Sequence, residues 1–161
     1  MKVNCKIFPF QERGIFPHLT VEENLAFAGM ELPKKEFRVR KEEVTSYFDL
    51  FKNTSNGRLK MEASYLSGGE QHQLALAMVL MKKPKLLILD EPSAGLSPGN
   101  VKRLYEILGK MKDEERISIL LIEQNVKFAD RFSNRISLLQ EGKLQANDVS
   151  LEEIEKKYFN N

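Results

Sequence analysis

The sequence lacks the features that mark secreted and membrane-spanning proteins. Its 161 residues include a single cysteine, Cys5, which excludes a disulfide within the chain and is typical of a reducing compartment. Its longest apolar runs, Leu86–Leu89 and Ile117–Ile122, are far shorter than the roughly 20 residues that a helix needs to span a bilayer. The N-terminus shows no charged, apolar and small-residue succession of a signal peptide. We therefore expect a soluble cytosolic protein that contacts a membrane only through a partner.

An excess of charge of one sign is also absent. Lysine and arginine number 25, and aspartate and glutamate number 23, which gives a formal net charge of +2. Because nucleic-acid-binding domains usually carry a clustered basic surface, this balance predicts no nucleic-acid partner. The length indicates one domain, and 42% hydrophobic residues are enough for a packed core at this size.

A third absence concerns phosphate binding. The chain contains no G-x-x-x-x-G-K-[S/T] motif, the glycine-rich loop whose backbone N–H groups and lysine hold the phosphates of a nucleotide. Two Gly-Lys pairs come nearest to it. Gly109-Lys110 has Leu104 at the position of the first glycine, and Gly142-Lys143 has Ser137 there. The chain by itself therefore lacks the usual loop for binding a nucleoside triphosphate.

The pattern of apolar residues predicts an α/β fold in two parts. Helical patterns follow one another from Thr20, which forms a capping box with Glu23 at the start of the first helix. Beyond Pro84, short apolar runs alternate with helical patterns, which favours a mostly parallel sheet. We expect a helical subdomain over 20–83, an α/β core over 1–19 and 84–140, and a C-terminal turn and helix over 141–161.

Four apolar segments are the candidate strands. Residues 3–8 predict a first strand that Pro9 ends, and Arg135–Leu139 predicts a last one. Leu86–Leu89 and Ile117–Ile122 are continuous apolar runs between turn signals, which is typical of strands covered on both faces. We expect all three strands after Pro84 to be buried.

Two carboxylates stand where a parallel sheet binds ligands. Asp90 and Glu91 come directly after the apolar run Leu86–Leu89, and ligands bind at the carboxyl ends of parallel strands. Mg²⁺ takes carboxylate oxygens while it keeps several waters, which suits Asp90. A neighbouring glutamate can polarise an attacking water as a general base, which suits Glu91. A charged turn at the end of a strand is an equally good interpretation of these two residues taken alone.

Ser67-Gly68-Gly69 precedes a helical pattern that runs to about Met81. Glycines let a backbone approach a phosphate closely, and a helix N-terminus offers free N–H donors and a favourable dipole. An ordinary helix cap explains this segment better when it is taken alone. The occurrence of both motifs in this order and spacing favours the functional interpretation of each.

Together, these motifs resemble those of the ATP-binding subunits of ABC transporters. Leu66–Glu70 resembles their signature motif, and Leu86–Glu91 resembles their Walker B motif with its catalytic glutamate. Ser93–Pro98 stands in the place of the D-loop. The resemblance covers nearly the whole chain. It implies a P-loop NTPase fold in partial form, with ATP and Mg²⁺ as cofactors.

The resemblance also implies roles for individual residues. Phe8–Gln11 stands at the Q-loop, so Gln11 is expected to contact nucleotide, Mg²⁺ and the transporter. Asp90 is the expected Mg²⁺ ligand. Glu91 is the expected catalytic base, with Gln124 at the position of the family's switch histidine. The residues expected to bind nucleotide in the signature motif are Leu66, Ser67, Gly68, Gly69 and Glu70.

Several details resemble one branch, the ATPases of branched-chain amino-acid importers. These are the segment Gly14–Leu19, Glu70 in place of the usual glutamine, Ser97-Pro98 in the D-loop, and Gln124-Asn125. Importers of urea and other amides would look alike. The resemblance implies an ATP-hydrolysing, energy-coupling subunit that pairs head to tail with a second ATPase subunit. It would lie on the inner face of the cell membrane through a permease partner.

The absent phosphate loop alters these expectations. In the family this loop lies upstream of the Q-loop, and the chain resembles a family member truncated before that point. Charge-assisted hydrogen bonds contribute about 1.5–3 kcal/mol each, whereas micromolar binding amounts to only about 8 kcal/mol. We therefore expect the isolated chain to bind ATP weakly or not at all, and to hydrolyse it very slowly if at all. It would then be a gene fragment or a partial reading frame.

The upstream segment should also contain a strand, expected between the Asp90 strand and the Ile117–Ile122 strand. Its absence predicts either a gap there or direct pairing of the two edges. Two other functions stay open from the sequence. One is a non-catalytic module that completes a partner's ATP site, and the other is a fragment of an SMC-type DNA-maintenance ATPase.

Overall fold

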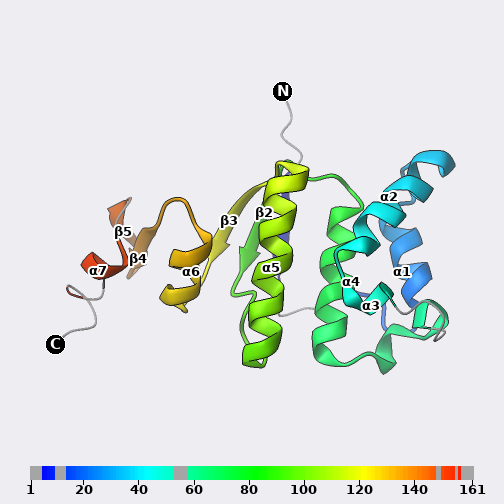
Figure 1. Ribbon diagram of the computed structural model, residues 1–161, viewed down its shortest axis with the longest axis horizontal. Helices are drawn as coiled ribbons and strands as arrows, with labels where there is room; N and C mark the ends of the chain where they lie inside the picture. Colours follow the sequence, from blue (N-terminus) through cyan, green and yellow to red (C-terminus); the bar gives the residue numbers. More distant parts are fainter. Residues whose placement is uncertain (1–4, 10–13, 53–57, 148–149, 155, 157–161) are drawn as a thin grey trace.

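The computed structural model describes residues 5–9, 14–52, 58–147, 150–154 and 156. Its helices α1 to α4 lie at one end of the molecule, next to a short parallel sheet that carries helix α5 (Figure 1). A two-stranded hairpin and the last short helix lie at the other end (Figure 1).

The helical part begins at a capping box, as the sequence predicts. The Thr20 side chain accepts a hydrogen bond from the backbone N–H of Glu23, and the Glu23 carboxylate accepts one from the N–H of Thr20. This cap starts α1, and the apolar positions of the following helices turn toward one another. The elements are α1 (Val21–Ala28), α2 (Lys34–Ser46), α3 (Asp49–Lys52), the 3-10 turns η3 (Arg58–Lys60) and η4 (Ala63–Tyr65), and α4 (Gly68–Leu80).

The three strands of the main sheet are parallel and lie in the order β1 (Cys5–Pro9), β2 (Leu86–Asp90), β3 (Ser118–Ile122). Pro9 pairs with Asp90 and therefore belongs to β1, beyond the predicted end of that strand. Asp90 in turn stands opposite Ile122. The structure thus excludes a gap between β2 and β3, and the two strands pair directly along their whole length.

Helix α5 (Pro98–Glu115) connects β2 to β3. Its N-terminus has Ser97 as the capping residue and a proline in the first turn, although the Ser97 side chain makes no cap hydrogen bond. Pro98 suits this position because its fixed backbone angle is already helical and no N–H is needed there. After β3 come α6 (Val126–Phe132), the antiparallel pair β4 (Ser137–Gln140) and β5 (Lys143–Asn147), and α7 (Leu151–Ile154).

The core joins the helical part to the inner face of the sheet. Burial of such apolar side chains contributes about 25 cal/mol per Å² removed from water, which makes this continuous cluster the main source of stability. Leu87 and Leu89 of β2 are fully buried. The other fully or almost fully buried apolar residues are Val21, Leu25, Val44, Phe48, Ala63, Leu74, Ala75, Leu76, Ala77, Leu80, Met81, Leu108 and Met111.

Several expectations for the C-terminal half were wrong or incomplete. Arg135–Leu139 was expected to be a buried strand, but β4 lies in a separate hairpin and Leu139 is 67% exposed. Ile117–Ile122 was expected to be buried on both faces, but alternate residues of β3 are exposed. Strand β4 pairs with β5 in its own two-stranded sheet, and β3 is packed against the core on one face only. Helix α6 and strand β5 were not predicted.

The proposed division into a helical subdomain and an α/β core stays a prediction. Within the part of the chain that the structure describes, no helix is both long enough and apolar enough to cross a membrane.

Candidate functional site

The carboxyl end of β2 carries both predicted acidic residues. The Asp90 side chain is exposed, and Glu91 is half-buried. Glu91 adopts a left-handed backbone conformation with φ of 48°, which only a minority of residues other than glycine do. Its backbone N–H donates a 2.9 Å hydrogen bond to the carbonyl oxygen of Ile122. The turn after β2 is therefore fixed to the end of β3.

Gln124 meets Glu91 at this turn. Its side-chain Nε2 donates a hydrogen bond of 2.5 Å to Oε1 of Glu91, so the two predicted catalytic residues lie in direct contact. Both belong to loops that follow parallel strands, which is why residues 33 positions apart meet. A neutral amide beside a carboxylate leaves the negative charge in place while it orients the oxygen atoms. This arrangement suits a group that aligns water for attack on a phosphate.

Glu123 holds the loop that follows Glu91. Its Oε1 accepts a 3.0 Å hydrogen bond from the backbone N–H of Ser93 and another of 3.0 Å from the hydroxyl of Tyr105. Burial, together with the charge of Glu123, raises the pKa of the Tyr105 hydroxyl well above its usual value. Glu123 was not among the predicted site residues, although its position between β3 and Gln124 was a usable signal.

The signature segment forms the N-terminal cap of α4. The Ser67 hydroxyl accepts a hydrogen bond of 3.4 Å from the N–H of Glu70, and Oε2 of Glu70 accepts one of 2.9 Å from the N–H of Ser67. Leu66 is buried in the core, whereas Ser67 and Gly68 are exposed. The free first-turn N–H groups of a helix attract phosphate oxygens. The motif thus has both a capping role and an accessible donor surface.

The Glu70 carboxylate binds two other residues of the protein. Its carboxylate forms an ion pair with Arg58 in addition to its hydrogen bonds with Ser67. Burial raises the pKa of Glu70, but the Ser67 hydrogen bonds and the Arg58 charge outweigh burial, and the net pKa lies below the usual value. Glu70 is therefore well placed to orient Ser67 and the start of the helix.

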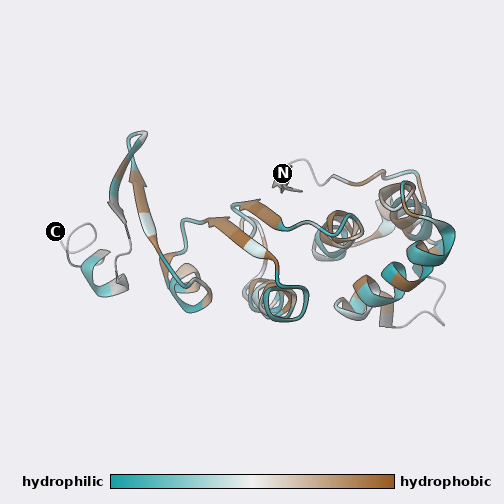
Figure 2. Ribbon diagram, turned by 90° about the horizontal axis from the view of Figure 1, so that it is seen from above, coloured by the Kyte–Doolittle hydropathy of each residue, from teal (hydrophilic) through white to brown (hydrophobic). Residues whose placement is uncertain are grey.

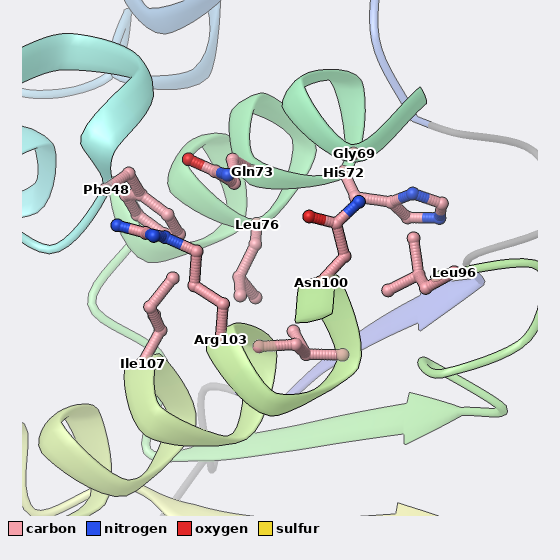
Figure 3. Close-up of a pocket in the computed structure, with 10 residues that line it drawn as sticks. Phe48, Gly69, His72, Gln73, Leu76, Leu96, Asn100, Arg103 and Ile107 are labelled. Carbon is pink, nitrogen blue, oxygen red and sulfur yellow. The ribbon is translucent and has the colours of Figure 1, made fainter. Parts of the chain in front are cut away.

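Gly69 lies against the start of α5 (Figure 3). A Cβ atom at this position would stand 2.8 Å from Nδ2 of Asn100, so the Asn100 side chain would have to move to admit a side chain here. The residues around this contact form a small pocket between α4 and α5 (Figure 3). No comparable restriction applies at Gly68, where a Cβ would meet nothing within 4 Å. Asn100 was not among the predicted site residues, and no signal in the sequence marks it.

The candidate site has two halves, the signature segment at the start of α4 and the acidic residues at the end of β2, and both lie on the same side of the molecule. Strand β2 ends, and helices α4 and α5 begin, at the lower end in Figure 1. The structure therefore brings Asp90, Glu91 and Gln124 into one group and places Ser67–Gly69 at the start of a separate helix. Gln11 lies outside the described residues.

Mg²⁺ fits the chemistry of this end only with help from a ligand. Among the described residues, no three or more histidine, cysteine, aspartate and glutamate side chains gather as a metal cluster. Mg²⁺ is typically bound by one or two carboxylates together with substrate phosphates and waters. The exposed carboxylate of Asp90 meets the first of these needs, and the phosphates must come with a nucleotide.

These elements define an α/β protein with a parallel sheet and a capped helix start that resembles a signature motif. The profile described as ABC transporter matches residues 6–94, and the chain belongs to this family. The branched-chain amino acid transport ATP-binding protein BraG of Pseudomonas aeruginosa is 36% identical over 149 residues. The probable branched-chain amino acid transport ATP-binding protein LivF of Archaeoglobus fulgidus is also 36% identical over 149 residues. Each match covers 92% of this chain and 61% of the relative.

Solved structures show the same fold. The cbiO1 protein of Clostridium perfringens, part of the ABC transporter complex cbiONQ, superposes with a TM-score of 0.77 at 24% identity. That match covers 96% of this chain and 64% of the other. A dimeric structure of the ATP-binding cassette MJ0796 bound to ADP and Pi has a TM-score of 0.72 at 22% identity. It covers 90% of this chain and 62% of the other. The predicted fold class, an α/β ABC ATPase fold with a parallel sheet, is confirmed.

The chain thus spans about three fifths of the length of the relatives it matches.

Proposed function

We propose that this chain forms part of the ATP-hydrolysing, energy-coupling subunit of an ABC importer for branched-chain amino acids. The observation that carries the proposal is the contact between Gln124 and Glu91 beside the exposed Asp90, at the carboxyl end of a parallel sheet. The names of BraG and LivF support branched-chain amino acids as the substrate.

In this proposal Glu91 aligns the attacking water and Gln124 holds its carboxylate. Asp90 binds Mg²⁺ that arrives with ATP, and Gln11 adds a further contact to the metal and nucleotide. The chain contains no phosphate loop of its own, so a segment that carries one must complete the site. When ATP is bound at the completed site, hydrolysis breaks a bond of the ATP molecule.

The signature segment acts on a second ATPase subunit. Ser67, Gly68 and Gly69 offer the exposed start of α4 to the nucleotide of that partner, while Leu66 and Glu70 fix the cap in place. The dimeric structure of MJ0796 supports pairing of two such subunits. A permease partner holds the assembly at the inner face of the membrane, as the family resemblance implies.

Donation of half a site to a partner is the second candidate function. It needs neither a phosphate loop in this chain nor any role for Glu91. The exposed, intact cap of Ser67 favours it, because that cap is formed within this chain alone. The two functions differ in whether hydrolysis depends on Glu91 or only on the signature segment.

Substitution of Ser67 by aspartate tests the signature contact. Aspartate caps a helix about as well as serine, so Ser67→Asp should leave folding intact but repel the phosphates of a bound nucleotide. We expect ATP hydrolysis by a complex with full-length BraG to fall at least about tenfold. Thr20→Asp, at the matching cap of α1, is the control and should leave the rate unchanged. An equal rate for both variants would refute the signature role.

Titration of the isolated chain with Mg-ATP in a calorimeter tests the missing loop. We expect no binding in the micromolar range, since the strongest phosphate contacts are absent. Micromolar binding would show that the chain holds a nucleotide by other residues.

A further inference from the structure

A groove between helices α5 and α6 takes no part in the candidate site. Both helices lie on the same side of β2 and β3 (Figure 2). The groove has a volume of about 360 Å³, which is within the range of small-molecule sites. Its walls come from one face of each helix and combine aromatic rings with side chains of both charges.

Three aromatic rings line the groove. The rings of Tyr105 and Phe128 are parallel, with centroids 5.3 Å apart, and the Phe132 ring meets Tyr105 edge to face at 5.5 Å. The Tyr105 hydroxyl already donates to Glu123, so only the ring is left for a ligand. Lys112 is engaged as well, because its Nζ lies 5.3 Å from the centre of the Phe132 ring and donates to the Phe132 carbonyl oxygen at 3.4 Å. These contacts give the groove a preformed apolar wall.

Gly109 lines the groove from the middle of α5. Glycine destabilises a helix interior relative to alanine, because it loses more conformational freedom on folding. Close packing does not require a glycine here, since a Cβ atom would meet nothing within 4 Å. The space that a side chain would fill is therefore left open to the groove, where a ligand can lie against the helix backbone.

Two side chains of opposite charge line the groove without pairing. Asp113 belongs to α5 and Arg131 to α6, and both are exposed. With the residues that the structure describes, neither forms an ion pair or a side-chain hydrogen bond. Lys102 and Glu106, by contrast, form an ion pair of 3.9 Å along α5. The groove thus offers an anion from one helix and a cation from the other, beside an apolar wall.

We infer that the groove between α5 and α6 binds an amino acid with an apolar side chain. Arg131 would bind its carboxylate, which suits the two parallel donors of a guanidinium, and Asp113 would bind its ammonium group. The apolar side chain would lie over Gly109, against the rings of Tyr105 and Phe128. A ligand with one charge would leave Asp113 or Arg131 without a partner. Such binding uses α5 and α6 alone, so it needs neither ATP nor a partner subunit.

Titration of the full 161-residue chain with L-leucine tests this site. We expect saturable binding with a Kd of about 1 mM, because the ligand is small and the groove is open. Shifts of backbone amide signals in NMR spectra should be confined to α5 and α6. Two analogues test the need for both charges. 4-Methylpentanoate lacks the ammonium group and 3-methylbutylamine lacks the carboxylate, and each should bind at least about threefold more weakly than L-leucine.

Gly109→Leu is the diagnostic variant for the position of the ligand. Leucine favours a helix more than glycine does, so the variant should stay folded while its side chain fills the groove. We expect saturable binding of L-leucine to be lost. Lys110→Leu, at an exposed position of α5 outside the groove, is the matched control, and its affinity should stay within about twofold. Thermal unfolding of both variants checks that they are folded.

Arg131→Gln and Asp113→Asn test the two charged ends of the site. Each should lower the affinity for L-leucine at least about threefold. Lys127→Gln, at an exposed position of α6 outside the groove, should leave it unchanged.

Three results would overturn the inference. They are a titration that does not saturate at about ten times the expected Kd, undiminished binding by Gly109→Leu, and equal affinity for L-leucine and 4-methylpentanoate. The last result would show a site for a carboxylate alone. Because the titration contains no nucleotide, its failure would leave the proposed ATPase function untouched, and loss of hydrolysis in a complex would leave this site untouched.

Discussion

The side-chain amide of Gln124 donates a hydrogen bond to the carboxylate of Glu91 across the ends of two paired strands. The same turn is held by a backbone bond from Glu91 to Ile122 and by Glu123, which accepts from the N–H of Ser93. These contacts involve only residues within this chain. The contact between these two proposed catalytic residues is therefore formed by this chain alone.

Gln124→Glu tests whether the contact serves hydrolysis. The substitution would replace the hydrogen-bond donor by a second carboxylate and place two like charges side by side. Their repulsion would move the Glu91 carboxylate out of the position in which it aligns the attacking water. We expect ATP hydrolysis in a complex with full-length BraG to fall at least about tenfold, with unfolding in urea changed by less than about 1 kcal/mol. Gln140→Glu, on the exposed strand β4, is the control for added charge. Equal rates for the two variants would assign Gln124 no part in hydrolysis.

Glu123→Gln should lower the pKa of the Tyr105 hydroxyl. Burial and the Glu123 charge both raise that pKa in the native protein, and the substitution removes the charge while it keeps a hydrogen-bond acceptor. The chain has no tryptophan and four tyrosines, so near-ultraviolet absorbance of the phenolate follows their titration directly. We expect one of the late titration steps to move to lower pH.

Tyr105→Phe identifies that step by removing it. Tyr47 provides the internal reference, because burial and the neighbouring glutamates Glu114 and Glu115 raise its pKa in the same direction. Its titration should not change in Glu123→Gln. An unchanged Tyr105 titration would show that Glu123 does not interact with the hydroxyl in solution.

Local signals in the sequence predicted the elements that hold the candidate site. The capping residues Thr20 and Ser67 each lie three residues before their glutamate partner. Both helix starts could therefore be predicted without knowledge of the fold. The strand Leu86–Asp90 was predicted at the right place; Leu87 and Leu89 are buried, Leu86 and Ile88 are half-buried, and Asp90 is exposed. The position after a buried strand suggested a base at Glu91, and the family resemblance then supplied the predicted role of Gln124, which no local pattern gives.

The misjudged features depend on long-range packing. An apolar run indicates that a strand can be covered on both faces, but in the described structure alternate residues of β3, Leu120 among them, are exposed. Strand β5 is mostly polar and exists through its pairing with β4. The short helix α6 had a signal in the Asn125 cap, which accepts from the N–H of Phe128. Residue pairs such as Gly69 and Asn100 become visible only in the structure.

Acidic pH should destabilise the chain through its capping glutamates. The pKa values of Glu23 and Glu153 are lowered by hydrogen bonds from Thr20 and Ser150, and that of Glu70 is lowered although burial opposes it. Because the pKa of each glutamate is lower in the folded state than in the unfolded state, the unfolded chain binds more protons at acidic pH. The free energy of unfolding therefore falls as the pH drops from about 4.5 through the folded-state pKa. Urea unfolding at decreasing pH measures this loss. Glu70→Gln keeps a capping partner without a titratable group, and should show a weaker pH dependence.

Arg40 links α2 to two distant segments from a buried position. Its side chain is 2% exposed, donates bonds of 3.1 and 2.7 Å to the carbonyl oxygen of Leu80, and pairs with Glu115 at 2.6 Å. Arg40→Met would leave that carbonyl and the half-buried Glu115 without their partner. We expect a loss of about 3 kcal/mol in the free energy of unfolding, measured in urea. Arg38→Met, at an exposed position of the same helix, should change it by less than about 0.5 kcal/mol. Combining Arg40→Met with Glu115→Gln should recover part of the loss, because the second change removes the charge that the first left unpaired; a double variant no more stable than Arg40→Met would show that the Leu80 carbonyl, and not the ion pair, accounts for the effect.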